Sequence, residues 1–110
     1  MQVVKSDRIT FFDVDDTLIL WDKLDYALPI VEINGREFQV HTKHVQKIHD
    51  YHVMGFKVVV WSTSGFQWAE TVVKALKLTN EVDYVMSKPH RIFDDVETIE
   101  QTLKHGYIKL

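Results

Sequence analysis

Residues 8–17 read RITFFDVDDT, and this stretch decides the fold that the sequence predicts. Its first half is rich in β-branched and aromatic residues, which is typical of a buried β-strand. The strand runs into an acidic cluster that contains Asp13 and Asp15. Alternate side chains at the end of a strand point the same way, so both carboxylates are expected to reach one point.

Two further strands are predicted downstream. Residues 56–61 read FKVVVW, which is the clearest strand signal in the chain, and Ser62 follows directly. Residues 82–86 form another short apolar run. Helical patterns separate the three strands, and strands that alternate with helices predict a parallel sheet covered by helices.

The two helices have recognisable ends in the sequence. The first is predicted over residues 42–54, with Thr42 as its N-cap and Gly55 just beyond its last turn. The second is predicted to start at Ser64, because Ser64 and Gln67 form the pattern of a capping box. Its apolar stripe consists of Trp68, Ala69, Val72, Val73 and Leu76.

A β-hairpin is predicted over residues 29–41, with its turn at Asn34 and Gly35. Both turn positions tolerate the positive φ that a type I′ turn requires. The turn predicts three cross-strand pairs: Ile33 with Arg36, Glu32 with Glu37, and Val31 with Phe38. One face is then mostly apolar (Val31, Ile33, Phe38, Val40), and the other, with the two glutamates and Gln39, is predicted to face water.

The C-terminal part of the chain predicts a fourth strand at residues 91–93, after Lys88. Asp94 and Asp95 then open a predicted helix that runs to about residue 104, and residues 107–110 form a last short strand. In a parallel sheet the carboxyl ends of the strands meet at one edge. The polar residues that follow the predicted strands are therefore expected to gather there.

Those polar residues suit a divalent cation. The carboxylates of Asp13 and Asp15 repel each other at close range unless a cation lies between them or one is protonated. A third carboxylate, from Asp94 or Asp95, completes a set of oxygen ligands. Oxygen ligands with room for water and a phosphate are typical of Mg²⁺ sites.

The acidic cluster and its neighbours resemble a known family. Residues 13–18 read DVDDTL directly after an apolar strand and resemble the DxDxT signature of the haloacid dehalogenase (HAD) superfamily of phosphohydrolases. Ser62 resembles the second motif, Lys88 the third, and Asp94-Asp95 the fourth, in the family's order. The likeness covers the chain from about Arg8 to Lys104. It implies an α/β fold with a three-layer, Rossmann-like parallel sheet, here with a hairpin flap after the first strand and no cap domain.

The resemblance implies a role for each acidic residue. Asp13 is the expected nucleophile, which forms an aspartyl-phosphate, and Asp15 is expected to protonate the leaving oxygen and then to activate water. Mg²⁺ is the expected cofactor, held by Asp13, Asp15 and the fourth-motif pair. Within that pair we favour Asp95 as the metal ligand and Asp94 as its support, with a simple N-cap as the other role for Asp94.

Phosphate binding is expected from Ser62 and Lys88, with Thr63 as the alternative to Ser62. Only five residues separate Lys88 from Asp94, fewer than the family usually has. Fully extended, five residues reach about 17 Å. A crossing of about three strand spacings already takes roughly 14 Å. Either the fourth strand is therefore very short, or Lys88 lies away from the family's usual lysine position and is a plain surface lysine.

Histidine residues can form a metal site, and tryptophan residues can lie in the core or at the functional site. His41, His44, His49 and His52 recur along the first predicted helix, but no acidic or thiol partner stands at ligand spacing, so we do not favour zinc. Trp61 and Trp68 are expected in the core, and Trp21 at the mouth of the site.

Composition bounds the class of protein. The chain has 110 residues, and we expect residues 1–110 to form one domain. Its 45% hydrophobic and 26% charged residues are typical of a folded globular protein, and the lack of cysteine excludes thiol chemistry and cysteine metal sites. The sequence lacks a signal segment and an apolar stretch long enough to span a bilayer, which predicts a cytoplasmic protein without a membrane partner.

The predicted function is Mg²⁺-dependent hydrolysis of phosphomonoesters, on a small molecule or the end of a macromolecule. One alternative is a module that binds Mg²⁺ or phosphate without turnover. Another is a phosphatase for 3′-phosphates at nucleic-acid ends, which the net charge of −3 disfavours. An open site also suits a homo-oligomer whose neighbouring subunits close over it.

Overall fold

The computed structural model describes residues 3–22 and 27–89. The elements, in chain order, are β1 (Ile9–Asp13), β2 (Ile19–Leu20), β3 (Ile30–Ile33), β4 (Arg36–Val40), α1 (Thr42–Val53), β5 (Lys57–Ser62), α2 (Phe66–Ala75) and β6 (Tyr84–Ser87). The strand expected at residues 91–93, the helix that Asp94 and Asp95 were expected to open, and the strand at residues 107–110 lie outside the described residues.

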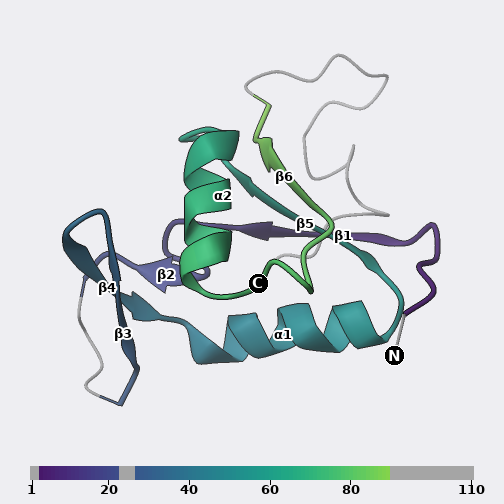
Figure 1. Cartoon of the computed structure of the whole chain (residues 1–110), viewed down its shortest axis with the longest axis horizontal. Helices are drawn as coiled ribbons and strands as arrows, with labels where there is room; N and C mark the ends of the chain where they lie inside the picture. Colours follow the sequence, from purple (N-terminus) through teal and green to yellow (C-terminus); the bar gives the residue numbers. More distant parts are fainter. Residues whose placement is uncertain (1–2, 23–26, 90–110) are drawn as a thin grey trace, which may run out of the picture.

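The main sheet has three parallel strands in the order β1-β5-β6, and this confirms the predicted parallel α/β arrangement (Figure 1). Helix α1 lies in the connection from β1 to β5, and α2 lies in the connection from β5 to β6, because parallel neighbours need a crossover connection. The register sets Asp13 beside Trp61, and Ser62 beside Ser87. The last residues of all three strands therefore lie at one edge of the sheet.

Both helices pack into the same hydrophobic core as one face of this sheet. Phe12 of β1 and the alternate residues Val58 and Val60 of β5 are completely buried. Ile48 of α1 and Val72 of α2 join them without exposure to solvent. Burial of each such side chain stabilises the fold by about 1.5–3 kcal/mol. In Figure 1, α2 crosses in front of the strands and α1 runs below them.

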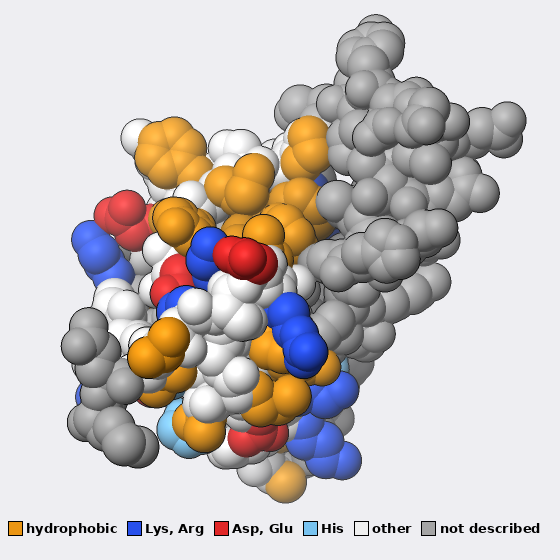
Figure 2. Space-filling view, turned by 90° about the vertical axis from the view of Figure 1, so that its right-hand side faces the viewer, with side chains coloured by type: hydrophobic (Ala, Val, Ile, Leu, Met, Phe, Trp, Pro, Cys, Tyr) orange, Lys and Arg blue, Asp and Glu red, His pale blue; other side chains and the backbone are white. Residues whose placement is uncertain are grey.

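The side of the molecule away from the hairpin carries mixed charges. Figure 2 shows acidic and basic side chains interspersed among hydrophobic ones on that face. Neither helix of the described residues is long and apolar enough to cross a membrane.

The hairpin forms with the predicted register. Ile33 pairs with Arg36, and Glu32 with Glu37, around a turn in which Asn34 and Gly35 both have positive φ. The prediction that Gln39 faces water is wrong, because this side chain is 2% exposed. The reason is β2, which pairs with the free edge of β4 and makes β4 the central strand of a second, three-stranded sheet.

The predicted N-cap residues of both helices are wrong, whereas Gly55 follows the C-cap of α1 as predicted, with a positive φ. The N-cap of α1 is His41, whose Nδ1 accepts a hydrogen bond from the backbone N–H of His44, and Thr42 is already helical. The N-cap of α2 is Gly65, with a φ of 105° and no side-chain cap, so Ser64 does not form a capping box. Instead Ser87, at the end of β6, accepts the N–H of Phe66 at 2.9 Å. Tertiary neighbours therefore replace the local cap.

The His41 cap makes the stability of the fold depend on pH. Burial, and next the neighbouring His44 imidazole, lower the pKa of His41 below its ordinary value of 6.5. The unfolded chain therefore takes up a proton at His41 more readily than the folded protein does. Stability from the neutral cap is present above pH 6.5 and is lost as the pH falls from there through the lower, folded-state pKa.

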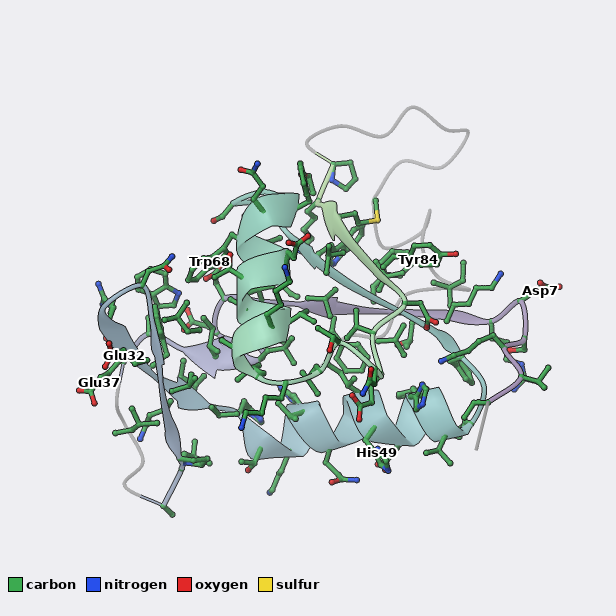
Figure 3. All side chains as sticks on the ribbon, in the orientation of Figure 1. Asp7, Glu32, Glu37, His49, Trp68 and Tyr84 are labelled. Carbon is green, nitrogen blue, oxygen red and sulfur yellow. The ribbon has the colours of Figure 1, made fainter. Side chains whose placement is uncertain are left out.

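We predict that His41→Asn, which keeps a cap acceptor but does not titrate, makes the unfolding temperature fall less between about pH 7.5 and about pH 5. Thermal unfolding followed by circular dichroism measures this difference. His49 is exposed on the same helix (Figure 3), and His49→Asn is the matched control that keeps the wild-type pH dependence. Identical pH dependence in His41→Asn and wild type contradicts the assignment.

Candidate functional site

The loop after β1 turns the chain sharply and holds Asp15 at the edge of the sheet. Val14 is fully buried, and its carbonyl oxygen accepts the N–H of Leu18 at 2.9 Å. Asp16 lies in the left-handed region, with a φ of 59°, which Asp tolerates better than most residues. Its N–H donates to the carbonyl of Ile19 at 2.7 Å, so the loop folds back on itself.

The Asp15 carboxylate joins three separate parts of the chain. Its Oδ1 accepts the indole N–H of Trp21 at 2.8 Å and that of Trp68, from α2, at 3.1 Å. Its Oδ2 lies 3.4 Å from the hydroxyl of Ser62, which donates to it. Figure 3 shows Trp68 on the side of α2 that faces the hairpin. Sequence reasoning placed Trp68 in the core and missed this contact.

Ser62 is fully buried at the end of β5 and organises the turn that follows. Its hydroxyl accepts the N–H of Ser64 at 3.0 Å, and its carbonyl accepts the N–H of Gly65 at 3.1 Å. Thr63, the sequence-predicted alternative, is exposed in the same turn. The Ser62 hydroxyl thus lies between the Asp15 carboxylate and the backbone N–H groups that precede α2.

Lys88 lies beside the end of β5. Its backbone N–H donates to the carbonyl of Ser62 at 2.9 Å, which extends the pairing of β5 with β6 by one step. Its Nζ lies 5.4 Å from the centre of the Trp61 ring. Trp61 is the residue of β5 that pairs with Asp13 of β1. Within the described residues no carboxylate forms an ion pair with Lys88. A cation is therefore present at the edge where the strands end.

Asp13, the last residue of β1, is partly exposed. In the part of the chain that the structure describes, no hydrogen bond or ion pair engages its carboxylate. Asp94 and Asp95, the other predicted acidic residues of the site, lie outside the described residues. The structure therefore brings together Asp15, Ser62 and Lys88 at the end of β1.

The chemistry of this donor set fits Mg²⁺. Among residues 3–22 and 27–89 there is no group of three or more histidine, cysteine, aspartate or glutamate side chains arranged to hold a metal. Mg²⁺ does not need such a cage, because it usually takes one or two carboxylates together with water and substrate phosphate. Asp13, whose carboxylate has no protein partner in the described part, and Asp15, two residues later, are the candidate carboxylates for such an ion.

An aromatic cluster adjoins Asp15 and connects it to the hairpin. The Trp21 ring lies edge-on to Phe38 of β4, with ring centres 4.9 Å apart, and 6.4 Å from the Trp68 ring. Phe38 and Trp68 are 6.0 Å apart. The apolar face of the hairpin therefore packs against the two indoles that hold Asp15. Trp21, which the sequence predicts at the mouth of the site, is 37% exposed.

Two cavities in the described structure are lined by residues other than those around Asp15. A cavity of about 240 Å³ lies between α2 and β6 and is lined by residues such as Glu70, Val73 and Tyr84. Another, of about 200 Å³, is lined by Leu28, His41, Thr42 and Lys43.

Comparison of the chain with protein-family models, curated proteins and solved structures gave no significant match. The function is therefore argued from the residues around Asp15.

We predict that Trp68→Phe lowers the free energy of unfolding by about 1–2 kcal/mol, because it removes one hydrogen bond to a carboxylate but keeps an aromatic ring. Urea unfolding measures the change. In an Asp15→Ala background the same replacement should cost less by about 1 kcal/mol, since the acceptor is already gone. Equal costs in the two backgrounds mean that the Trp68–Asp15 contact contributes nothing.

Proposed function

We propose that this protein is a Mg²⁺-dependent phosphomonoesterase that works through an aspartyl-phosphate on Asp13. The observation that carries the proposal is the meeting of Asp15, Ser62 and Lys88 at the carboxyl edge of a parallel sheet, directly after the strand that ends in Asp13. The order of these residues along the chain and the parallel order β1-β5-β6 support a HAD-like, Rossmann-like arrangement without a cap domain.

In the first step a carboxylate oxygen of Asp13 attacks phosphorus. The bond from phosphorus to the leaving oxygen breaks, and Asp15 donates its proton to that oxygen. In the second step Asp15 takes a proton from water, which attacks phosphorus. The bond between phosphorus and Asp13 then breaks, and inorganic phosphate leaves. Because the reaction is divided into two displacements, the same pair of residues, Asp13 and Asp15, acts in both steps.

The hydrogen bonds of Asp15 determine which of its oxygens carries the proton. Oδ1 already accepts two indole N–H groups, from Trp21 and Trp68. Oδ2 has the longer contact, 3.4 Å, with the Ser62 hydroxyl. A proton on Oδ2 therefore disrupts fewer hydrogen bonds than a proton on Oδ1. The two indoles fix the direction in which Oδ2 faces. Trp21 and Trp68 act as positioning residues.

Charge is the main barrier for a carboxylate that attacks a phosphate dianion. At about 4 Å and an effective dielectric constant of about 20, each like-charge pair costs roughly 4 kcal/mol. The Lys88 ammonium, at the same edge of the sheet, offsets part of this repulsion. Ser62 donates a hydrogen bond to a phosphate oxygen once substrate competes with Asp15 for its hydroxyl. Mg²⁺ would be held by the carboxylate of Asp13 and would supply further neutralisation of the phosphate charge, because the two oxygens of Asp15 are engaged by the indoles and by the transferred proton.

We predict that the protein releases phosphate from p-nitrophenyl phosphate in the presence of Mg²⁺, and that Asp13→Asn lowers kcat by at least about a thousandfold because the nucleophile is lost. Asp16→Asn is the matched control. Asp16 is exposed, and Asn keeps the side-chain oxygen that accepts the Trp21 backbone N–H. Its kcat should stay within about threefold of the wild type.

Beryllium fluoride distinguishes a working nucleophile from a binding module. It should form an adduct on Asp13 in the wild type and none in Asp13→Asn, as read by mass spectrometry of the native protein or by ¹⁹F NMR. Mg²⁺ binding without an adduct or turnover in the wild type rejects the enzymatic proposal and leaves the binding module.

Lys88 offers an independent test. Lys88→Gln removes the cation that lies 5.4 Å from the centre of the Trp61 ring and should lower kcat/KM by about tenfold to a hundredfold. Lys47, exposed on α1, provides the control Lys47→Gln, for which kcat/KM should not change. Steady-state kinetics with p-nitrophenyl phosphate measures both variants, and an equal effect of the two substitutions contradicts the assigned role of Lys88.

A further inference from the structure

The face of the hairpin that packs near the site carries one cation at its rim. Arg36 is the first residue of β4 and lies on the same side of the strand as Phe38, two residues later. Its guanidinium carbon lies 4.5 Å from the centre of the Trp21 ring and 5.7 Å from that of Phe38. Phe38 is buried and Arg36 is exposed, so the aromatic cluster ends in a charged group at the surface.

Arg36 has no acidic partner among residues 3–22 and 27–89. The neighbouring glutamates, Glu32 and Glu37, face each other across the hairpin and project from its outer side (Figure 3). Glu37 follows Arg36 directly, and successive strand residues point to opposite faces. Contact with an aromatic ring leaves a guanidinium able to bind an anion with its N–H groups.

Trp21 links this cation to the proposed acid. One edge of its indole donates to Asp15 Oδ1 at 2.8 Å, and its ring lies under Arg36. The leaving group of a phosphomonoester must adjoin Asp15, because Asp15 gives it a proton. A leaving group that extends away from Asp15 on the hairpin side therefore passes Trp21 and then reaches Arg36.

We propose that Trp21 and Arg36 form a subsite for a second anionic group, a phosphate or a carboxylate, carried by the leaving group of the substrate. The inference rests on the proposed function and narrows its substrate class to phosphomonoesters with a second anion on a short spacer. The Trp21 ring provides an apolar surface for the spacer, and the guanidinium of Arg36 binds the anion through paired N–H groups.

Matched pairs of esters test the subsite. Alkanediol bisphosphates with about three to six carbons are compared with the alkyl monophosphates of equal length, and 2-phosphoglycolate is compared with ethyl phosphate. The first pair measures the effect of a second phosphate on kcat/KM, and the second pair measures the effect of a carboxylate. We expect kcat/KM to favour the doubly anionic ester by about tenfold or more at one spacer length. In Arg36→Gln this preference falls to near unity, and Arg36→Lys retains part of it.

Arg8 provides a matched control. Its guanidinium also lies over an aromatic ring, 5.8 Å from the centre of Phe56, but it precedes β1 at the end of the strand away from Asp13. Arg8→Gln should keep both the activity and the preference. Loss of the preference in Arg8→Gln as well, or a wild type without any preference, overturns the subsite.

A binding measurement separates this inference from the proposed function. Calorimetry with Asp13→Asn compares 1,3-propanediol bisphosphate with propyl phosphate, and the NMR signal of the Trp21 indole N–H reports the place of binding. If the wild type hydrolyses no ester but the bisphosphate binds more tightly through Arg36, catalysis is rejected and the subsite stands. If esters are hydrolysed with no preference and no Arg36-dependent binding, the subsite is rejected and the phosphatase stands.

Discussion

The carboxylate of Asp15 is the contact on which the rest of the site depends. One oxygen accepts the indole N–H groups of Trp21 and Trp68, and the other accepts the hydroxyl of Ser62. These donors come from the loop after β1, from α2 and from the end of β5. A charged acceptor that faces three donors fixes their relative positions, because each unpaired donor or acceptor in a partly buried place costs free energy.

The same contact explains why the hairpin belongs to the site. Trp21 and Trp68 present their rings to Phe38, so the apolar face of β4 is buried against the indoles rather than against the main sheet. The addition of β2 to the other edge of β4 then stiffens the hairpin into a three-stranded sheet. Arg36 thereby gains a defined place above Trp21, near the proposed leaving group.

The edge of the main sheet combines opposite charges in a way that suits phosphate chemistry. Asp13 and Asp15 repel a phosphate dianion, and Lys88 attracts it. Because parallel strands direct their carboxyl ends to one edge, the residue after each strand meets the others there despite a large separation in sequence. Ser62 and Asp15, 47 residues apart, illustrate the effect. The proposed mechanism uses this geometry together with a proposed divalent cation.

The sequence by itself determined the three strands of the main sheet, their parallel arrangement, the register of the hairpin and the place of Asp13 and Asp15 at the end of the first strand, because these features follow from local periodicity, turn residues and strand ends. It did not predict β2. Only the tertiary structure decided that Trp68 binds Asp15 across 53 residues, that Gln39 is buried, and that His41 and Gly65 cap the helices. A local pattern cannot specify such contacts, since a hydrogen-bond donor has no preference for one distant acceptor until the crossovers and the packing of the core bring the two together.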